Sequence, residues 1–219
     1  MIKLPDFEKS FEYENNFYLS CYPNRIHKII AQYELFKNTI NIDGEIVECG
    51  VFKGSSLIRF GIFREIFKIN KKIIGFDTFD KFPETAYDDD KKIRQNFVNG
   101  AGIDSIGKDQ LLSILTKKNI NNLIDLIEGN ILETIPSYVK KNPNLQISLL
   151  NLDTDIYEPT KIILEYLYPK ITPGGILILD DYNTFPGETM AVNEFLKDRN
   201  EQIKTSPYNN NLHYIIKKN

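Results

Sequence analysis

Two apolar stretches of this sequence each lead into a pair of aspartates, and this pattern constrains the fold more than any other. The stretches are residues 149–152, followed by Asp153 and Asp155, and residues 176–179, followed by Asp180 and Asp181. An apolar run without polar alternation is typical of a strand buried on both faces of a parallel sheet. Open parallel sheets bind their ligands at the carboxyl ends of such strands. Four carboxylates gathered there repel one another unless a cation joins them, so the pattern predicts a divalent metal site.

Predicted strands and helices alternate along most of the chain. Residues 45–50 form the first predicted strand, a helix covers 55–67, and residues 71–77 complete a β-α-β unit. The later predicted strands are 122–128, 145–153, 176–181, 203–205 and 212–217. The remaining predicted helices are 23–38, 107–118, 131–141, 159–168 and 188–199. This order predicts an α/β fold with a doubly wound, mostly parallel sheet of seven strands and an antiparallel C-terminal edge.

The N-terminal region precedes the first predicted strand and is rich in aromatic residues. These are Phe7, Phe11, Tyr13, Phe17 and Tyr18. Their rings either cover the sheet or a subunit interface, or they help to form a substrate pocket. We therefore divide the chain into an N-terminal helical extension, residues 1–40, and a main domain, residues 41–219.

Residues 78–105 form the least regular stretch, because glycine, proline and charged residues cluster there. A loop of this length inside a compact domain is typical of a lid or a binding loop. Its acidic run, Asp88 to Asp90, is predicted to be a solvated helix start or a loop.

Charge and cysteine content restrict the class of protein. The 219 residues carry a net charge of −3, which argues against a dedicated nucleic-acid binder but leaves an RNA substrate open. No stretch has the length and apolarity of a signal peptide or a membrane span, so we expect a cytoplasmic protein that binds no membrane. The two cysteines and two histidines do not form a zinc motif.

The turn after the first predicted strand is rich in small residues. It reads Glu48-Cys49-Gly50-Val51-Phe52-Lys53-Gly54-Ser55-Ser56. Gly50 permits the close approach of a ligand, and the helix that starts at Ser55 offers free N–H groups. Glu48 would repel a pyrophosphate but suits a positive group such as the amino group of an amino acid, and the spacing is not that of a dinucleotide site or a P-loop. An ordinary strand-to-helix turn is the alternative.

Asp77 ends the second predicted strand. In nucleoside-binding sheets an acid at this position accepts hydrogen bonds from ribose hydroxyls. Because it follows a glycine-rich turn, we favour this role for Asp77 over that of a simple turn former.

Four blocks of the sequence follow one another within residues 46–196. They are E-C-G-V-F-K-G-S-S, G-F-D-T-F-D-K-F-P, L-D-T-D-I-Y-E-P-T and P-G-G-I-L-I-L-D-D-Y. In this order they resemble the macrocin O-methyltransferase family. The resemblance implies a class I, Rossmann-like methyltransferase that moves a methyl group from S-adenosylmethionine to a hydroxyl of a small acceptor, a sugar or a phenol. Together with the aromatic N-terminus, it also implies a homodimer.

The resemblance implies roles for individual residues. The methionine end of S-adenosylmethionine would be held by Glu48, Gly50 and Ser55. Its ribose and adenine would lie among Asp77, Thr78, Phe79, Glu128, Gly129 and Asn130. Magnesium would be bound by Asp153, Asp180 and Asp181, and the general base would be Asp155.

Magnesium suits such an arrangement because it prefers oxygen ligands and keeps positions open for water or substrate. A coordinated hydroxyl becomes more acidic, and a nearby carboxylate then accepts its proton. Simpler roles remain open: Asp155 or Thr154 could cap the helix that follows, and Asp181 could belong to a turn. For the whole chain, the alternatives are a methyltransferase of the same fold that needs no metal and a protein that binds S-adenosylmethionine without catalysis.

Overall fold

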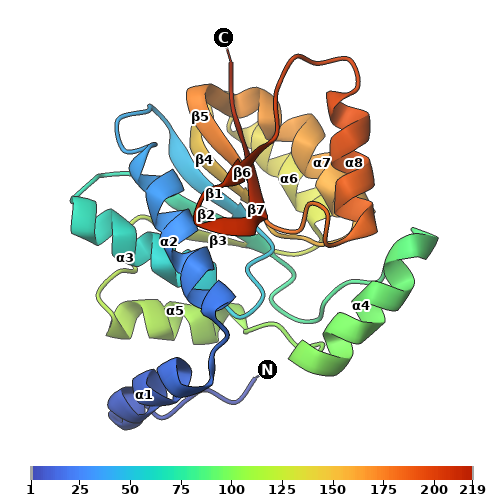
Figure 1. Cartoon of the computed structure of the whole chain (residues 1–219). Helices are drawn as coiled ribbons and strands as arrows, with labels where there is room; N and C mark the ends of the chain where they lie inside the picture. Colours follow the sequence, from blue (N-terminus) through green and yellow to red (C-terminus); the bar gives the residue numbers. More distant parts are fainter. Residues whose placement is uncertain (1, 219) are drawn as a thin grey trace.

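The computed structural model describes residues 2–218, which form one mixed sheet of seven strands with helices around it (Figure 1). The strands are β1 Glu45–Cys49, β2 Ile73–Asp77, β3 Ile124–Glu128, β4 Ile147–Leu152, β5 Ile171–Leu179, β6 Lys204–Ser206 and β7 Asn209–Ile216. Their order across the sheet is β3-β2-β1-β4-β5-β7-β6. The strands from β1 to β5 pair in parallel, whereas β7 is antiparallel to both β5 and β6. The predicted sheet with an antiparallel C-terminal edge is confirmed.

Helices cover both faces of this sheet (Figure 1). The helices are α1 Ser10–Ser20, α2 Pro23–Lys37, α3 Ser55–Phe67, α4 Asp88–Ala101, α5 Lys108–Lys117, α6 Ile131–Lys141, α7 Tyr157–Tyr166 and α8 Pro186–Leu196. One apolar cluster joins α2, α3 and α5 to one face of the sheet, and a second joins α6, α7 and α8 to the other face. The strand order reverses between β1 and β4, which is the place where such sheets bind ligands.

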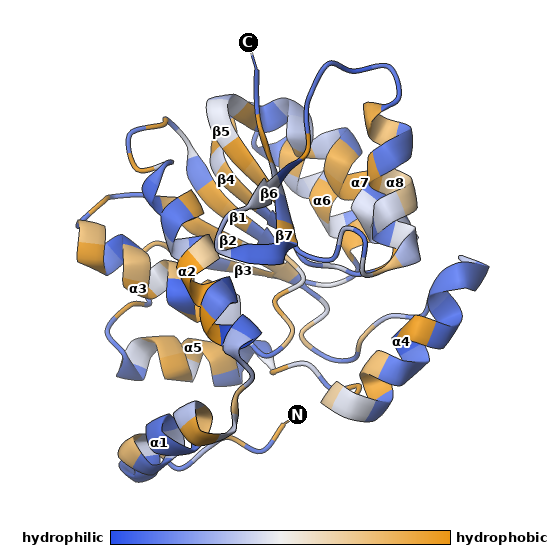
Figure 2. Cartoon of the chain, viewed as in Figure 1, coloured by the Kyte–Doolittle hydropathy of each residue, from blue (hydrophilic) through white to orange (hydrophobic). Residues whose placement is uncertain are grey.

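The central strands are apolar because helices bury both of their faces. Every residue of β2 and of β4 is buried. In Figure 2 the central strands are largely apolar, while the surrounding helices carry both apolar and polar residues. The uninterrupted apolar runs of the sequence therefore correspond to central strands, as predicted.

Some predicted boundaries move. β5 starts at Ile171 rather than at 176, because its first residues already pair with Ile147 of β4. β7 starts at Asn209 rather than at 212, because the terminal hairpin continues up to Ser206. α7 starts two residues before Pro159, which leaves the proline in its first turn.

The helix α4 is the largest departure from the sequence prediction. It has 14 residues and lies within the stretch that was predicted to be irregular. Its fully buried residues are Asp90 and Arg94, and charged residues outnumber the half-buried apolar residues Ile93, Phe97 and Ala101, which follow one another at helical spacing. The prediction that the acidic run is solvated is also wrong in part, because Asp90 is fully buried while Asp88 and Asp89 are exposed.

The N-terminal extension packs on the sheet domain through α2. Phe36 of α2 is buried and stacks on Phe60 of α3, with ring centroids 6.0 Å apart. By contrast, α1 has no buried residue. Within residues 2–218, no helix has both the length and the apolar character that crossing a membrane requires.

Candidate functional site at the carboxyl ends of the strands

A cavity of about 1200 Å³ opens at the carboxyl ends of β1, β2, β4 and β5. The residues that follow these strands and line it include Gly50, Asp77, Asp153 and Asp180. Phe97 of α4 also lines the cavity, and its ring centroid lies 5.3 Å from that of Phe82. The helix that the sequence did not predict therefore supplies an aromatic wall of the candidate site.

All four predicted acids line this cavity. β4 and β5 pair Leu152 with Leu179, and the amide of Asp180 donates to the carbonyl of Leu152 at 3.1 Å, so the two acid pairs leave the sheet side by side. Three of the acids bring one carboxylate oxygen each to within 4.8 Å of one another; they are Asp153, Asp155 and Asp181. Oxygen atoms at this spacing can share one cation.

Asp155 is buried and Asp153 and Asp181 are half-buried, and the carboxyl groups of all three hold their protons strongly. Burial raises the pKa of Asp153, Asp155 and Asp181 well above the usual range, and the repulsion between neighbouring carboxylates raises it further. Asp155 also has a φ of +65°, a left-handed conformation that few residues other than glycine adopt. Like charge and backbone strain concentrated in one cavity are typical of a functional site. A hard cation such as magnesium fits these oxygen donors.

Asp180 is held instead by a cation from the N-terminal extension. Lys28 of α2 donates to Oδ2 of Asp180 at 2.5 Å, although 152 positions separate the two residues. Burial disfavours the charge of Lys28, but the attraction of Asp180 and Asp153 outweighs it, so the pKa of Lys28 is raised. The structure thus groups Asp155, rather than Asp180, with the other two acids. The division into three metal ligands and one base stays a prediction.

A fifth carboxyl group, that of Glu188 in α8, lies beneath the cluster and was not singled out in the sequence. It is fully buried, and its Oε1 accepts a hydrogen bond from the amide of Asp181 at 3.1 Å. Burial and the charge of Asp181 raise the pKa of Glu188 well above its usual range. Glu188 therefore holds the backbone of Asp181, and only its place in the first turn of the helix after the acid pair could have indicated this.

Glu48, the fourth residue of β1, is fully buried and is not among the residues that line the cavity, although Ser56, which donates to it, does line it. Its Oε1 accepts hydrogen bonds from Ser56 and from Asn151, the latter at 3.2 Å, whereas Oε2 has no partner among residues 2–218. Burial raises the pKa of Glu48 to about 7. A buried carboxylate oxygen without a partner fits a ligand that brings a positive group to this position.

The turn between β1 and α3 brings backbone to the cavity. Gly50 has a φ of +88°, and a Cβ there would lie 1.6 Å from the carbonyl oxygen of Asp153, so the glycine is required by the neighbouring chain as well. Ser55 lines the cavity at the start of α3. The N-cap residue of α3 is Gly54, so no capping side chain accepts a hydrogen bond from the first N–H groups of this helix. The free N–H groups of this helix start suit a negative group such as a carboxylate.

Asp77 lines the cavity but is already engaged by the backbone. Its Oδ2 accepts from the amide of Phe52 at 2.9 Å, and its Oδ1 accepts from the amide of Phe79 at 2.7 Å. Oδ1 also accepts from the hydroxyl of Thr78 at 3.3 Å, so Asp77 ties the β1–α3 turn to the end of β2 and keeps a second lone pair for a ribose hydroxyl on Oδ2. Thr78 lines the cavity as well, whereas Phe79 is buried in the apolar core outside the cavity lining.

The end of β3 reaches the cavity through Asn130, whose side chain also caps α6 by accepting from the amide of Leu132. Glu128 is exposed, and neither Glu128 nor Gly129 is among the residues that line the cavity. The contacts predicted between these residues and adenine stay predictions.

Asp90 of α4 connects the wall of the cavity to two further helices. Its Oδ2 accepts from the amide of Tyr157, the first residue of α7, at 3.0 Å, and its Oδ1 accepts from the amide of Gly187 in the first turn of α8 at 2.7 Å. A Cβ on Gly187 would lie 1.9 Å from Oδ2 of Asp90. Because α7 and α8 follow the two acid pairs, one buried carboxylate links α4 to both.

The profile of the macrocin-O-methyltransferase (TylF) family matches residues 24–209. The demethyldecarbamoylnovobiocin O-methyltransferase of Streptomyces niveus is 30% identical over 166 residues, which are 71% of this chain and 59% of that protein. A tetracenomycin-C 4'-O-methyltransferase of Streptomyces olivaceus is 27% identical over 146 residues, which are 64% of this chain and 54% of that protein. The chain therefore spans less than two thirds of the length of these relatives.

Solved structures share the fold. CalS11, a calicheamicin methyltransferase, is 26% identical with a TM-score of 0.74, covering 94% of this chain and 85% of that one. The O-methyltransferase NovP is 22% identical and has a TM-score of 0.77, and the match covers 89% of this chain and 81% of that one. At this identity, the similarity supports the fold alone. The family profile covers most of the chain and all four acids of the cavity, and so the chain belongs to the macrocin O-methyltransferase family.

Proposed function

We propose that this protein is a magnesium-dependent O-methyltransferase that transfers a methyl group from S-adenosylmethionine to a hydroxyl of a small acceptor. The observation that carries the proposal is that Asp153, Asp155, Asp180 and Asp181 all line one cavity, which also reaches the β1–α3 turn. A sugar hydroxyl is favoured over a phenol. In support, the tetracenomycin relative is named for a substrate that carries a rhamnosyl group, and CalS11 is named a TDP-rhamnose 3'-O-methyltransferase.

The ends of β1 and β2 would hold S-adenosylmethionine. Glu48 would accept from its ammonium group through the oxygen that has no partner in the described chain. The N–H groups at Ser55 would meet its carboxylate, Asp77 and Thr78 would lie at the ribose, and Asn130 would lie toward the adenine.

The acids would hold magnesium and accept the proton. Asp153 and Asp181 are the proposed central ligands, with Asp180 as the third and Asp155 as the base. When bound, magnesium supplies positive charge that lowers the pKa of the acceptor hydroxyl, and S-adenosylmethionine supplies the methyl group. Asp155 accepts the hydroxyl proton while the new C–O bond forms and the C–S bond breaks, which leaves a methyl ether, S-adenosylhomocysteine and protonated Asp155. The ring of Phe97 limits water at the site, and the cavity walls orient the acceptor.

An assay with labelled S-adenosylmethionine and a panel of hydroxylated acceptors tests the proposal. We expect transfer that EDTA abolishes and magnesium restores. Transfer that survives EDTA would favour a methyltransferase of this fold that needs no metal. Calorimetric binding of S-adenosylmethionine without transfer to any acceptor would favour a non-catalytic binding protein.

We also propose a cytoplasmic homodimer whose contact surface includes the extension, residues 1–40, with no nucleic acid or membrane as partner. Supporting this, large apolar side chains on α1 are exposed: Phe11 by 75%, Tyr18 by 65% and Leu19 by 86%. Patches of this kind commonly mark contact surfaces. Sedimentation equilibrium of the full chain and of Phe11→Ser tests the assembly, and a monomer at all concentrations would contradict it.

A further inference from the structure

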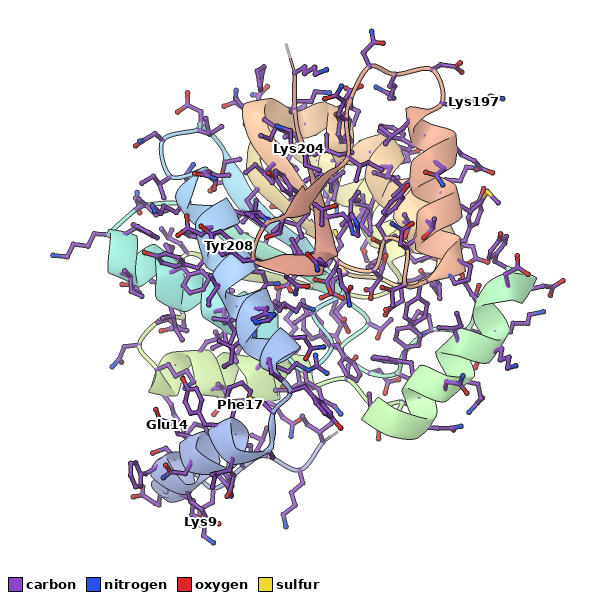
Figure 3. The ribbon with its side chains drawn as sticks, in the orientation of Figure 1. Lys9, Glu14, Phe17, Lys197, Lys204 and Tyr208 are labelled. Carbon is purple, nitrogen blue, oxygen red and sulfur yellow. The ribbon has the colours of Figure 1, made fainter. Side chains whose placement is uncertain are left out.

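A smaller cavity adjoins the proposed active site, and we infer that it receives the phosphate group of a phosphorylated sugar acceptor. The inference rests on the proposed function, because it names the class of acceptor for that same site. The smaller cavity has a volume of about 450 Å³ and shares Arg25, Lys28 and Ser55 with the main cavity. It lies between α1, α2 and α3, and its lining includes Phe17, which Figure 3 labels on the side of α1 that faces the rest of the chain.

The lining of the smaller cavity is cationic. It contains Arg25, Lys28 and Arg59 and no acidic side chain. Lys28 already pairs with Asp180, but Arg25 forms no ion pair with any described residue. Burial lowers the pKa of Arg59, and the charge of Arg25 adds to this effect while Glu48 and Asp180 oppose it. Arg25 and Arg59 line the same cavity, and two guanidinium groups that face one space favour the binding of an anion there.

Arg59 is held in an orientation that suits anion binding. Its Nε donates to Oε1 of Gln32 at 2.9 Å, and Gln32 is fully buried in α2. The two terminal nitrogens of Arg59 have no hydrogen-bond partner in the described part of the chain, and the residue lines the cavity. A guanidinium fixed through Nε with free terminal N–H groups is suited to bidentate recognition of phosphate.

Neighbouring acids balance the positive charges of Lys28 and Arg59, but no described acid pairs with Arg25. Lys28 and Arg59 favour the ionised form of Glu48, and Lys28 does the same for Asp153. These two cations therefore balance the acids of the main cavity. Arg25 is exposed at the opening that both cavities share, where an anionic ligand is the partner that it lacks.

The spacing along α2 fits a sugar phosphate. Arg25 precedes Lys28 by three positions, about 4.5 Å along the helix axis, and Lys28 contacts Asp180. A sugar with one hydroxyl at the acids can therefore present a phosphate, one ring away, to Arg25 and Arg59. The exposed rings of Phe17 and Tyr22 also line the smaller cavity and could stack on a base if the phosphate belongs to a nucleotide.

Calorimetry on the full chain, saturated with S-adenosylhomocysteine in metal-free buffer, tests the inference. The titrants are glucose 1-phosphate, UDP-glucose, inorganic pyrophosphate and methyl glucoside. We expect the phosphorylated sugars to bind at least about tenfold more tightly than methyl glucoside, and Arg25→Ala to remove this difference. Lys37→Gln, which removes a cation at the far end of α2, should change none of these affinities, and their salt dependence should fall in Arg25→Ala.

The outcomes separate this inference from the proposed function. Tighter binding of UDP-glucose than of glucose 1-phosphate indicates a nucleotide-linked sugar, and the reverse indicates a simple glycosyl phosphate. Binding of pyrophosphate without either sugar, or equal affinities in wild type and Arg25→Ala, overturns the inference. An unchanged circular dichroism spectrum and thermal midpoint of Arg25→Ala show that the variant is folded. If the wild type does not bind S-adenosylhomocysteine at all, the proposed function is contradicted, and with it the inference that rests on it.

Discussion

Asp155 and Asp180 occupy different surroundings within the same cavity. Asp155 lies with Asp153 and Asp181, whereas Asp180 pairs with Lys28. We expect Asp155→Asn to lower the single-turnover rate by about 10²- to 10⁴-fold while magnesium affinity changes little, because a base is lost and the ligands remain. Asp153→Asn should lower the rate and should also weaken magnesium binding, because a ligand is lost.

Magnesium titration by calorimetry, beside rates of methyl transfer, distinguishes these roles. Asp198→Asn, a change at an exposed acid far along the chain, is the matched control and should affect neither quantity. If Asp155→Asn weakens magnesium binding as much as Asp153→Asn does, then Asp155 is a ligand and another group must be the base.

Glu48 predicts how the binding of S-adenosylhomocysteine depends on pH. Burial raises the pKa of Glu48 to about 7, opposed by hydrogen bonds from Ser56 and Asn151 and by the charges of Arg59 and Lys28. Only the ionised carboxylate attracts the ammonium group, so affinity should rise as pH increases through 7 and be about tenfold weaker at pH 6 than at pH 8. In Glu48→Gln the affinity should be low and independent of pH between these values. Calorimetry at the two pH values measures this, and the same pH dependence in Glu48→Gln would assign the titration to another group.

The acids of the site were predictable because each pair directly follows an apolar strand, and parallel strands bring their ends to one edge. Lys28 and Glu188 were not, because each meets its acid through tertiary packing that has no local pattern. Lys28 lies on a helix 152 positions away from Asp180. Glu188 looks like an ordinary polar residue of a first helical turn, and its complete burial depends on how α8 packs.

The helix α4 shows how charged residues can outweigh a short apolar pattern, here Ile93, Phe97 and Ala101, when a sequence is interpreted. Its buried residues are polar, and hydrogen bonds rather than apolar packing hold them. Arg94 donates to the carbonyls of Pro83 and Phe82 at 2.6 and 3.0 Å, and Asp90 accepts from the starts of α7 and α8. A charged residue that a helix buries cannot be distinguished in a sequence from one that it exposes, as Asp88 to Asp90 demonstrate.

Because Asp90 caps two helices, its removal should destabilise the fold and loosen α4. We expect Asp90→Ala to lower the free energy of unfolding by roughly 2 kcal/mol or more, since each lost cap costs about 1 kcal/mol. Hydrogen exchange in α4 should rise in the same variant. Gly187→Ala should act similarly, because its Cβ would displace the Asp90 carboxylate.

Asp88→Ala is the control for this prediction, because Asp88 lies on the same helix with 88% of its side chain exposed and pairs only with Lys91. Its free energy of unfolding should stay close to that of the wild type. Urea denaturation provides the free energies. Equal values for Asp88→Ala and Asp90→Ala would show that the two caps contribute nothing.

At the scale of the molecule, the extension and the sheet domain share one site. The alternation of strands and helices correctly predicted the seven-stranded sheet, because central strands are apolar and crossovers are helical. The predicted boundary at residue 40 does not divide the chain by function, because residues from both sides of it line the main cavity. α2 lies before it, yet Phe36 belongs to the core under the sheet and Lys28 reaches Asp180. Substitutions in the extension should therefore alter the charge environment of the acids as well as the binding of the acceptor.

The buried acids also predict how the whole chain responds to magnesium. Asp153, Asp155, Asp181 and Glu188 have raised pKa values, so the folded protein binds more protons than the unfolded chain above the unfolded values near 4. Without metal, stability should therefore fall as pH rises from 5 to 8. Magnesium at 100 times the Kd that it has at pH 8 should restore about 3 kcal/mol at pH 8, or roughly 5 to 10 °C in Tm, and the same concentration should give a smaller gain at pH 6, where protons compete for the carboxylates.

Differential scanning calorimetry with EDTA or magnesium at both pH values measures this response. Asp153→Asn should lose most of the gain, and Asp198→Asn, at an exposed position, should keep it. Asp153→Asn should also be more stable than the wild type in EDTA at pH 8, because the free-energy cost of placing this carboxyl group beside the other acids is removed. If magnesium leaves Tm unchanged in the wild type while S-adenosylhomocysteine raises it, the acids serve the fold and the acceptor without a metal.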